Sequence, residues 1–220
     1  WLVYLFIICV ITLIAYRKFN YLLLGSSFII LFLTSTFLTS YKSLDQRKLI
    51  VYNISQTSAI NFIDGEDNIL VSDIKLTQNR SKLMFHVQNN WINNGVNNEK
   101  IIRLDHLFQK YQLSNIYRIS NKNLFTKRNY FQFYDKKIAI IDNKCVQKNT
   151  QKKLTIDLLI LTKNTKLSIT EILNQYNPLQ IVIDASNSTY NTKRLKEECK
   201  QQGVKCWSTM ANGAYQMKLN

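Results

Sequence analysis

The sequence predicts a mixed α/β domain preceded by two transmembrane helices. Residues 1–16 carry no charged side chain, and a second run from Tyr21 to Ser40 also lacks Asp, Glu, Lys and Arg. After Tyr41 the composition becomes polar, and short β-rich runs give way to alternating strands and helices. A bilayer core needs roughly 20 apolar residues per helix. The second run is therefore predicted to span the membrane, and the first to be a truncated span.

These observations assign residues 1–41 to the membrane and residues 44–220 to a soluble domain. The abrupt apolar start at Trp1 predicts further spans upstream in a multi-pass protein. Basic residues flank the second run at both ends in nearly equal numbers, so the positive-inside rule does not settle its orientation. If the loop with Arg17 and Lys18 is cytoplasmic, the domain lies on the periplasmic side of the bacterial inner (cytoplasmic) membrane.

The charge of the soluble part restricts its partners. All 14 acidic residues and 27 of the 29 basic ones follow Ser40, which leaves that part at +13. Such an excess favours a polyanion or an anionic lipid surface. A merely solvated surface is the alternative, because the lysines are spread along the chain.

The first half of the soluble part is predicted to be rich in strands. Three β-rich runs separated by turn residues indicate an antiparallel meander, and a later pair indicates a hairpin. The predicted ranges are the strands 48–54, 58–63, 68–72, 101–104 and 116–119, a loop at 88–98, and the hairpin strands 131–134 and 138–141.

The last third is predicted to alternate strands with helices. Ser168 and Glu171 form the pattern of a capping box, and Gly203 is placed to end the final long helix. Pro178 is predicted to end the first helix. The predicted ranges are the strands 154–161, 180–183, 204–207 and 214–219 and the helices 168–176 and 188–202.

The order of these pieces resembles the C-terminal part of the ComEC family, the membrane channel proteins of natural competence that pass single-stranded DNA into bacteria. It is most similar to the Bacteroidetes version. Val51–Ala59, Ile60–Ile63 and Leu70–Asp73 match the family's opening. The closing section is matched by Asp157–Leu161, the helix through Ile172, Pro178–Asp184, the helix through Leu195, Gly203-Val204 and Gly213-Ala214. The resemblance implies an α+β sandwich of the metallo-β-lactamase-like type.

The departures from the family bear on its chemistry. Active members hold two zinc ions with a His-x-His-x-Asp-His run, whereas this chain has only His86 and His106. Thr162-Lys163-Asn164 stands where a further histidine pair is expected, and a late histidine is missing near Tyr190-Asn191. We therefore expect a degenerate domain with no cofactor, no metal and no enzyme activity. An enzyme with an unrecognised site is the last option.

Three aspartates are the least implausible ligands for a cation. Asp64, Asp73 and Asp184 each follow a predicted strand, where α/β folds place functional carboxylates. Aspartates that cap loops are equally common at such positions.

The segment from Lys122 to Lys137 alternates cations with aromatic residues. Bases of a single strand stack on exposed rings while Lys and Arg neutralise phosphates. The candidate DNA-binding residues are Lys122, Lys127, Arg128, Tyr130, Tyr134, Lys136 and Lys137. The alternative is a plain hairpin in which Phe131 and Phe133 face the core and the lysines face water.

Cysteine usage leaves two options open. Cys199 and Cys206 flank the turn at Gly203, so they either form a disulfide in an oxidising compartment or remain two buried thiols.

The resemblance implies part of an inner-membrane channel protein for uptake of single-stranded DNA in natural transformation. This region would anchor a non-catalytic domain that docks or guides DNA or braces the channel. The expected partners are single-stranded DNA, the lipid bilayer and other competence or channel components. A homo-oligomer is a further possibility. The alternative is a membrane-anchored protein-interaction domain unrelated to DNA.

Overall fold

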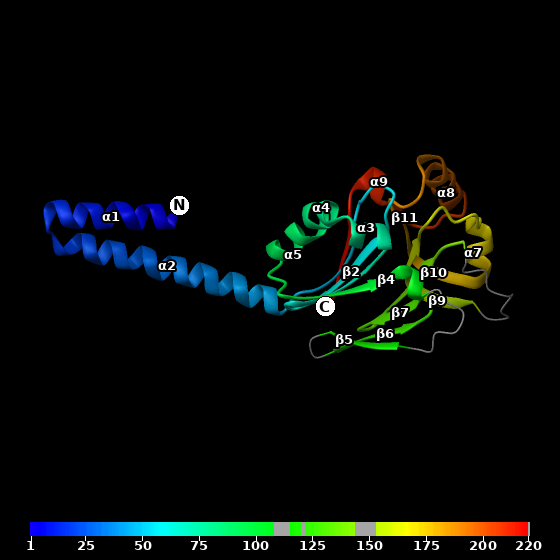
Figure 1. Ribbon diagram of the computed structural model, residues 1–220, viewed down its shortest axis with the longest axis horizontal. Helices are drawn as coiled ribbons and strands as arrows, with labels where there is room; N and C mark the ends of the chain where they lie inside the picture. Colours follow the sequence, from blue (N-terminus) through cyan, green and yellow to red (C-terminus); the bar gives the residue numbers. More distant parts are fainter. Residues whose placement is uncertain (108–114, 120–121, 144–152, 220) are drawn as a thin grey trace. The chain divides into compact units, whose positions relative to one another are not determined.

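The computed structural model describes residues 1–107, 115–119, 122–143 and 153–219 (Figure 1). The chain forms two compact units, Trp1–Asp45 and Gln46–Asn220.

The first unit is a pair of apolar helices. Helix α1 spans Leu2–Tyr16, Arg17 takes the left-handed conformation with φ 50°, and α2 spans Phe19–Leu44. Among the described residues, one helix is long and apolar enough to cross a membrane, with Phe19–Tyr41 as its candidate span. At 15 residues α1 is shorter than a span requires, so the second span stays a prediction.

The second unit contains two β-sheets, of which the first has the order β12-β1-β2-β3-β4. Its strands are β1 (Arg47–Val51), β2 (Ala59–Asp64), β3 (Asp67–Ser72), β4 (Asn98–Arg103) and β12 (Tyr215–Lys218). The predicted antiparallel meander β1-β2-β3 is confirmed. Strand β12 pairs with β1, so the end of the chain completes this sheet.

The parallel pairing of β3 with β4 requires a crossover, which is helical. It consists of α3 (Ile74–Gln78), α4 (Arg80–Leu83), the π-helical turn η1 (Met84–Gln88) and α5 (Asn89–Asn93). The predicted loop at 88–98 is therefore wrong over its first half. Its many asparagines suggested a loop, but Leu83, Val87 and Trp91 recur at helical spacing and are buried against the sheet.

The second sheet has the order β11-β10-β9-β8-β7-β6-β5. Its strands are β5 (Asn115–Ile119), β6 (Lys122–Lys127), β7 (Tyr130–Phe133), β8 (Lys136–Ile141), β9 (Leu154–Leu161), β10 (Tyr176–Ile183) and β11 (Cys206–Ser208). Strands β5 to β8 form an antiparallel meander that contains the predicted hairpin, and β8 to β11 pair in parallel. Strand β6 is not among the strands predicted from the sequence.

Helices α7 (Ile169–Gln175) and α8 (Thr189–Gln201) connect the parallel strands, and the single turns α6 (Leu104–Leu107) and α9 (Thr209–Asn212) follow β4 and β11. The capping box of Ser168 and Glu171 is confirmed, as is Gly203 just beyond α8 with φ 66°. Pro178 lies inside β10 rather than ending a helix. Strand β11 pairs only with Ile181–Ile183, so Pro178 faces an open edge where no N–H is needed.

Three apolar clusters give the unit four layers, helices over sheet over sheet over helices. The inter-sheet core joins the two sheets and includes Leu49, Phe62, Val71, Phe131, Phe133, Ile140 and Ile160. A second cluster packs α3–α5 on the first sheet, and a third packs α7 and α8 on the second. Figure 1 shows these helices on their respective sheets. All three clusters consist of residues from Gln46–Asn220, so this unit has a core of its own.

Phe62 lies at the centre of the inter-sheet core. It is fully buried, and its ring centroid lies 5.7 Å from that of Phe131 and 5.4 Å from that of Phe133. We expect Phe62→Ala to lower the free energy of unfolding of the Gln46–Asn220 fragment by about 3–5 kcal/mol. Denaturant unfolding measures this loss. The matched control Leu179→Ala removes an exposed side chain and should stay within about 0.5 kcal/mol. A loss for Phe62→Ala as small as that of the control would contradict the inter-sheet packing.

Candidate functional site: a basic aromatic groove and a polar cleft

The outer face of the second sheet carries a row of polar and aromatic side chains. Phe131 and Phe133 point into the inter-sheet core, so Tyr130 and Gln132 point outward. The register places Phe125 opposite Gln132 and Gln132 opposite Lys137 in one row across the sheet. In the neighbouring row Lys127 lies opposite Tyr130. The strand pairing therefore brings cations and rings from three strands onto one surface.

These side chains line a groove of about 580 Å³, which we call the β6–β9 groove. Its lining consists of Phe125, Lys127, Tyr130, Phe131, Gln132, Lys137, Ile138 and residues 153–156. The side chain of Phe125 is 38% exposed, and Lys127, Lys137 and Lys153 are exposed. The Tyr130 hydroxyl is held 2.9 Å from that of Tyr176 on β10, which fixes its ring at the side of the groove.

The structure thus brings together three of the predicted DNA-binding residues: Lys127, Tyr130 and Lys137. Phe125 and Lys153 lie with them and were missed. Alternation of Phe125 with the buried Leu124 could have identified Phe125, whereas the position of Lys153 depends on the pairing of β9 with β8.

Tyr134 lies apart from the groove. Its hydroxyl donates to Asp64 Oδ1 at 2.7 Å, and the guanidinium of Arg47 lies 5.0 Å from its ring centroid. Burial, together with the hydrogen bond to Asp64, raises the pKa of Tyr134 to about 12. This tyrosine therefore links the two sheets.

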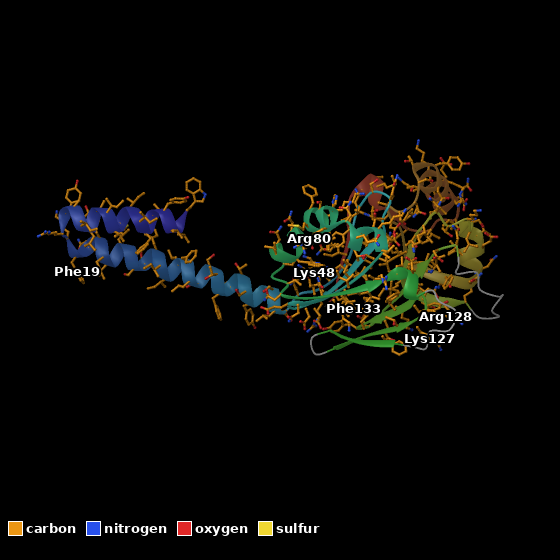
Figure 2. The ribbon with its side chains drawn as sticks, viewed as in Figure 1. Phe19, Lys48, Arg80, Lys127, Arg128 and Phe133 are labelled. Atoms are coloured by element: carbon orange, nitrogen blue, oxygen red, sulfur yellow. The ribbon has the colours of Figure 1, made fainter. Side chains whose placement is uncertain are left out.

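The remaining predicted residues occupy the turns or lie outside the described side chains. Figure 2 labels Lys127 and Arg128, which lie next to each other at the β6–β7 turn, where Arg128 is exposed and has φ 57°. Lys136 forms an ion pair with Asp135 at 2.6 Å in the β7–β8 turn. Lys122 begins β6, but its side chain lies outside the described part.

A second feature is a polar cleft of about 340 Å³ at the carboxyl ends of β3, β4, β9 and β10. The Nζ atom of Lys163 lies 3.0 Å from Asp73 Oδ1 and 2.5 Å from Asp105 Oδ1. Burial alone would lower the pKa of Lys163, but its hydrogen bonds to Asp105 and Asp73 outweigh burial and raise it. The ammonium therefore joins the ends of strands from both sheets.

The backbone at Lys163 is held in an unusual conformation by hydrogen bonds. Lys163 and Asn164 both have φ 53°, a left-handed conformation that costs energy for residues with a Cβ. The N–H of Lys163 donates to Ser186 Oγ at 2.8 Å, and the N–H of Ser188 donates to Asn164 Oδ1 at 2.5 Å.

Asp184 lies beneath the cleft and is fully buried. Its Oδ1 accepts hydrogen bonds from the hydroxyl and the N–H of Ser186. Burial raises the pKa of Asp184 to about 7, and the charge of Asp73 acts in the same direction, while hydrogen bonds from Ser186 and Ser58 oppose the rise. The carboxyl group is thus partly protonated at neutral pH.

Of the three aspartates considered for a cation, the structure brings together two. Asp73 and Asp184 interact electrostatically near the cleft. Asp64 ends β2, which runs antiparallel to β3, so it lies beside the start of β3, at the other end of the strands from Asp73. Within the ranges that the structure describes, no group of three or more His, Cys, Asp or Glu side chains is arranged to hold a metal ion.

Among the described side chains, His86, Cys199 and Cys206 join neither feature. His86 is half-buried on η1 against Phe85, and the side chain of His106 lies outside the described part. Cys199 and Cys206 are free thiols that contact each other beside α8, and hydrogen bonding to Cys206 raises the pKa of Cys199. Cys145 lies outside the described residues.

The fold and the surface define an α/β domain that follows a candidate membrane span and carries a basic, aromatic groove. A scan against protein-family models matched the ComEC C-terminal domain over residues 49–219. The chain belongs to the ComEC family, which places it among membrane proteins of DNA uptake in competence. A search of curated proteins and a search of solved structures each found no match.

Asp184 should make the stability of the domain depend on pH. Folding raises its pKa from 3.8 to about 7, so the folded state keeps a proton that the unfolded chain releases. The resulting stability is full below about pH 4 and is lost as the pH rises to about 7, with a slope of up to about 1.4 kcal/mol per pH unit. Denaturant unfolding of the Gln46–Asn220 fragment from pH 4 to 8 measures it.

Asp184→Asn should flatten this dependence, because the amide carries no charge at any of these pH values. The control Glu197→Gln changes an exposed carboxylate on α8 and should follow the unmodified fragment. If Asp184→Asn instead shows the same pH profile as the unmodified fragment, Asp184 does not carry the proton.

Proposed function

We propose that this domain docks single-stranded DNA on the β6–β9 groove and guides it during DNA uptake. The observation that carries the proposal is the clustering of Phe125, Tyr130, Lys127 and Lys137 on one face of one sheet. Exposed rings stack on bases of any sequence, at roughly 1–3 kcal/mol per base, and lysines neutralise phosphates. Membership of the ComEC family supports DNA as the polyanion.

The groove suits a single strand better than a duplex. A duplex hides the faces of its bases in the stack, so a ring lying at the side of a groove has no base to contact. A single strand laid across the sheet presents bases and phosphates together. The net charge of +13 after Ser40 would draw it to the surface.

We further propose that the domain is a degenerate, non-catalytic relative of the metallo-β-lactamase fold. Its layer order, helices over two sheets over helices, supports this view. At the strand ends the cation between the carboxylates of Asp73 and Asp105 is the ammonium of Lys163. An ammonium held there opposes a second positive charge in the same space.

The surrounding protein is proposed to be a multi-pass protein of the bacterial inner membrane with this domain on the periplasmic side. Candidate span α2 and the family support the membrane part. If the groove does not bind DNA, a bracing or protein-docking role for the domain is what remains.

The DNA proposal predicts that three groove residues act together. We expect Phe125→Ala, Lys127→Ala and Lys137→Ala combined to weaken binding of single-stranded oligonucleotide to the Gln46–Asn220 fragment at least about tenfold, through lost stacking and lost phosphate contacts. The slope of log K against log salt should fall by about 1.4, since each contact to a single strand contributes about 0.7. Fluorescence anisotropy across salt concentrations measures both quantities.

A matched control removes the same chemistry from another surface. Tyr190→Ala, Lys193→Ala and Lys196→Ala combined delete one exposed ring and two exposed lysines of α8. This control should bind DNA like the unmodified fragment. Equal losses in both triple variants would show non-specific attraction by net charge and would overturn the groove.

The non-catalytic proposal predicts that the fragment holds no zinc. After incubation with zinc and gel filtration, elemental analysis should find far less than one zinc per chain, because the ammonium of Lys163 already occupies the space between Asp73 and Asp105. One or two zinc ions per chain that are lost in Asp73→Asn, but kept in Glu197→Gln, would contradict the proposal.

A further inference from the structure

The crossover from α4 to α5 presents apolar side chains to solvent. Phe85 is 70% exposed, Ile92 is 73% exposed and Met84 is 49% exposed. They lie on the side of the segment away from Leu83, Val87 and Trp91, which are buried on the first sheet. We call the exposed residues Met84, Phe85 and Ile92, together with the exposed Arg80 and Lys82, the η1 patch.

The buried side of this segment holds the patch rigidly. Trp91 is 4% exposed, and the Tyr52 hydroxyl donates to Asn90 Oδ1 at 3.0 Å. A π-helical turn widens the helix. Leu83, Val87 and Trp91, which are spaced four residues apart, therefore stay on the buried side of the segment instead of shifting around it. The buried side therefore anchors the segment on the sheet. Its other side leaves large apolar side chains in contact with water.

The end of this segment is tied to the residues that follow the candidate span. Gln46 Nε2 donates to the carbonyl oxygen of Asn94, and Lys48 Nζ donates to Asn94 Oδ1 at 2.6 Å. Gln46 follows Tyr41, the last residue of the candidate span, by five residues. Five residues reach at most about 18 Å, so if α2 crosses the membrane, the chain allows the end of α5 to reach the membrane surface.

The chemistry of the η1 patch fits an anionic lipid surface. Apolar side chains enter the boundary between headgroups and acyl chains, while flanking Arg and Lys side chains pair with lipid phosphates. Figure 2 shows Arg80 on the helical layer of the first sheet and Lys127 and Arg128 on the second sheet. The patch is thus a different surface from the β6–β9 groove.

We propose that the η1 patch inserts Phe85, Met84 and Ile92 into the headgroup region of an anionic bilayer, with Arg80 and Lys82 on lipid phosphates. This inference rests on α2 crossing the membrane and not on DNA docking. Contact with the bilayer would restrict how the domain turns about the short connection after α2.

The test uses the full 220-residue chain in nanodiscs. A genetically encoded environment-sensitive fluorescent amino acid replaces Phe85 in one variant and Ile92 in a second. Leu179, an exposed apolar residue of the second sheet, is replaced in the matched control. All three positions are exposed, so the fold should tolerate the probe, and circular dichroism checks this.

We expect blue-shifted emission at positions 85 and 92, and quenching there when the nanodisc contains brominated lipid. Position 179 should show neither effect. Replacing phosphatidylcholine with phosphatidylglycerol should strengthen quenching at 85, and Arg80→Gln combined with Lys82→Gln should remove that increase.

Quenching at 85 no greater than at 179 would overturn the proposal. A blue shift at 85 without quenching by lipid would also overturn it, because it would show a protein partner or a second copy on the patch. DNA binding by the Gln46–Asn220 fragment is measured without lipid, so the two proposals fail independently.

Discussion

The packing of the two sheets against each other is the constraint on which the rest of the Gln46–Asn220 unit depends. Phe62 from the first sheet meets Phe131 and Phe133 from the second, and neighbouring strands fill the layer with aliphatic side chains. Because successive side chains of a strand point to opposite faces, burying Phe131 and Phe133 sends Tyr130 and Gln132 outward. A slip of one residue would exchange the core with the groove.

The same constraint separates two kinds of polar feature. Side chains in the middle of strands β6 to β8 form the open groove, where cations stay exposed beside rings. Residues at strand ends form the cleft, where Lys163 is held between two carboxylates and Asp184 is buried with a raised pKa. The groove therefore leaves its lysines exposed, as the DNA proposal requires, while the ion pairs of the cleft join the two sheets.

The two proposals assign different work to opposite layers. The outer face of the second sheet offers stacking and phosphate contacts, whereas the helices on the first sheet offer an apolar surface rimmed by Arg80 and Lys82. The hydrogen bonds from Gln46 and Lys48 to Asn94 tie the end of α5 to the first residues of the Gln46–Asn220 unit. The two proposed contacts therefore use different surfaces of the same unit.

The sequence by itself determined the apolar span, the start of α7, both ends of α8 and most strands, because these depend on local composition and periodicity. It left the burial of Phe131 and Phe133 as one of two interpretations. It misjudged residues 88–93, where asparagines hid the periodic burial of Val87 and Trp91. Only the tertiary structure showed that Tyr134 bonds to Asp64 instead of lining the groove, and that Lys153 lines the groove. It also showed that Lys163 pairs with Asp73 and Asp105. Those contacts depend on strand register and on connections between distant segments, which no local pattern contains.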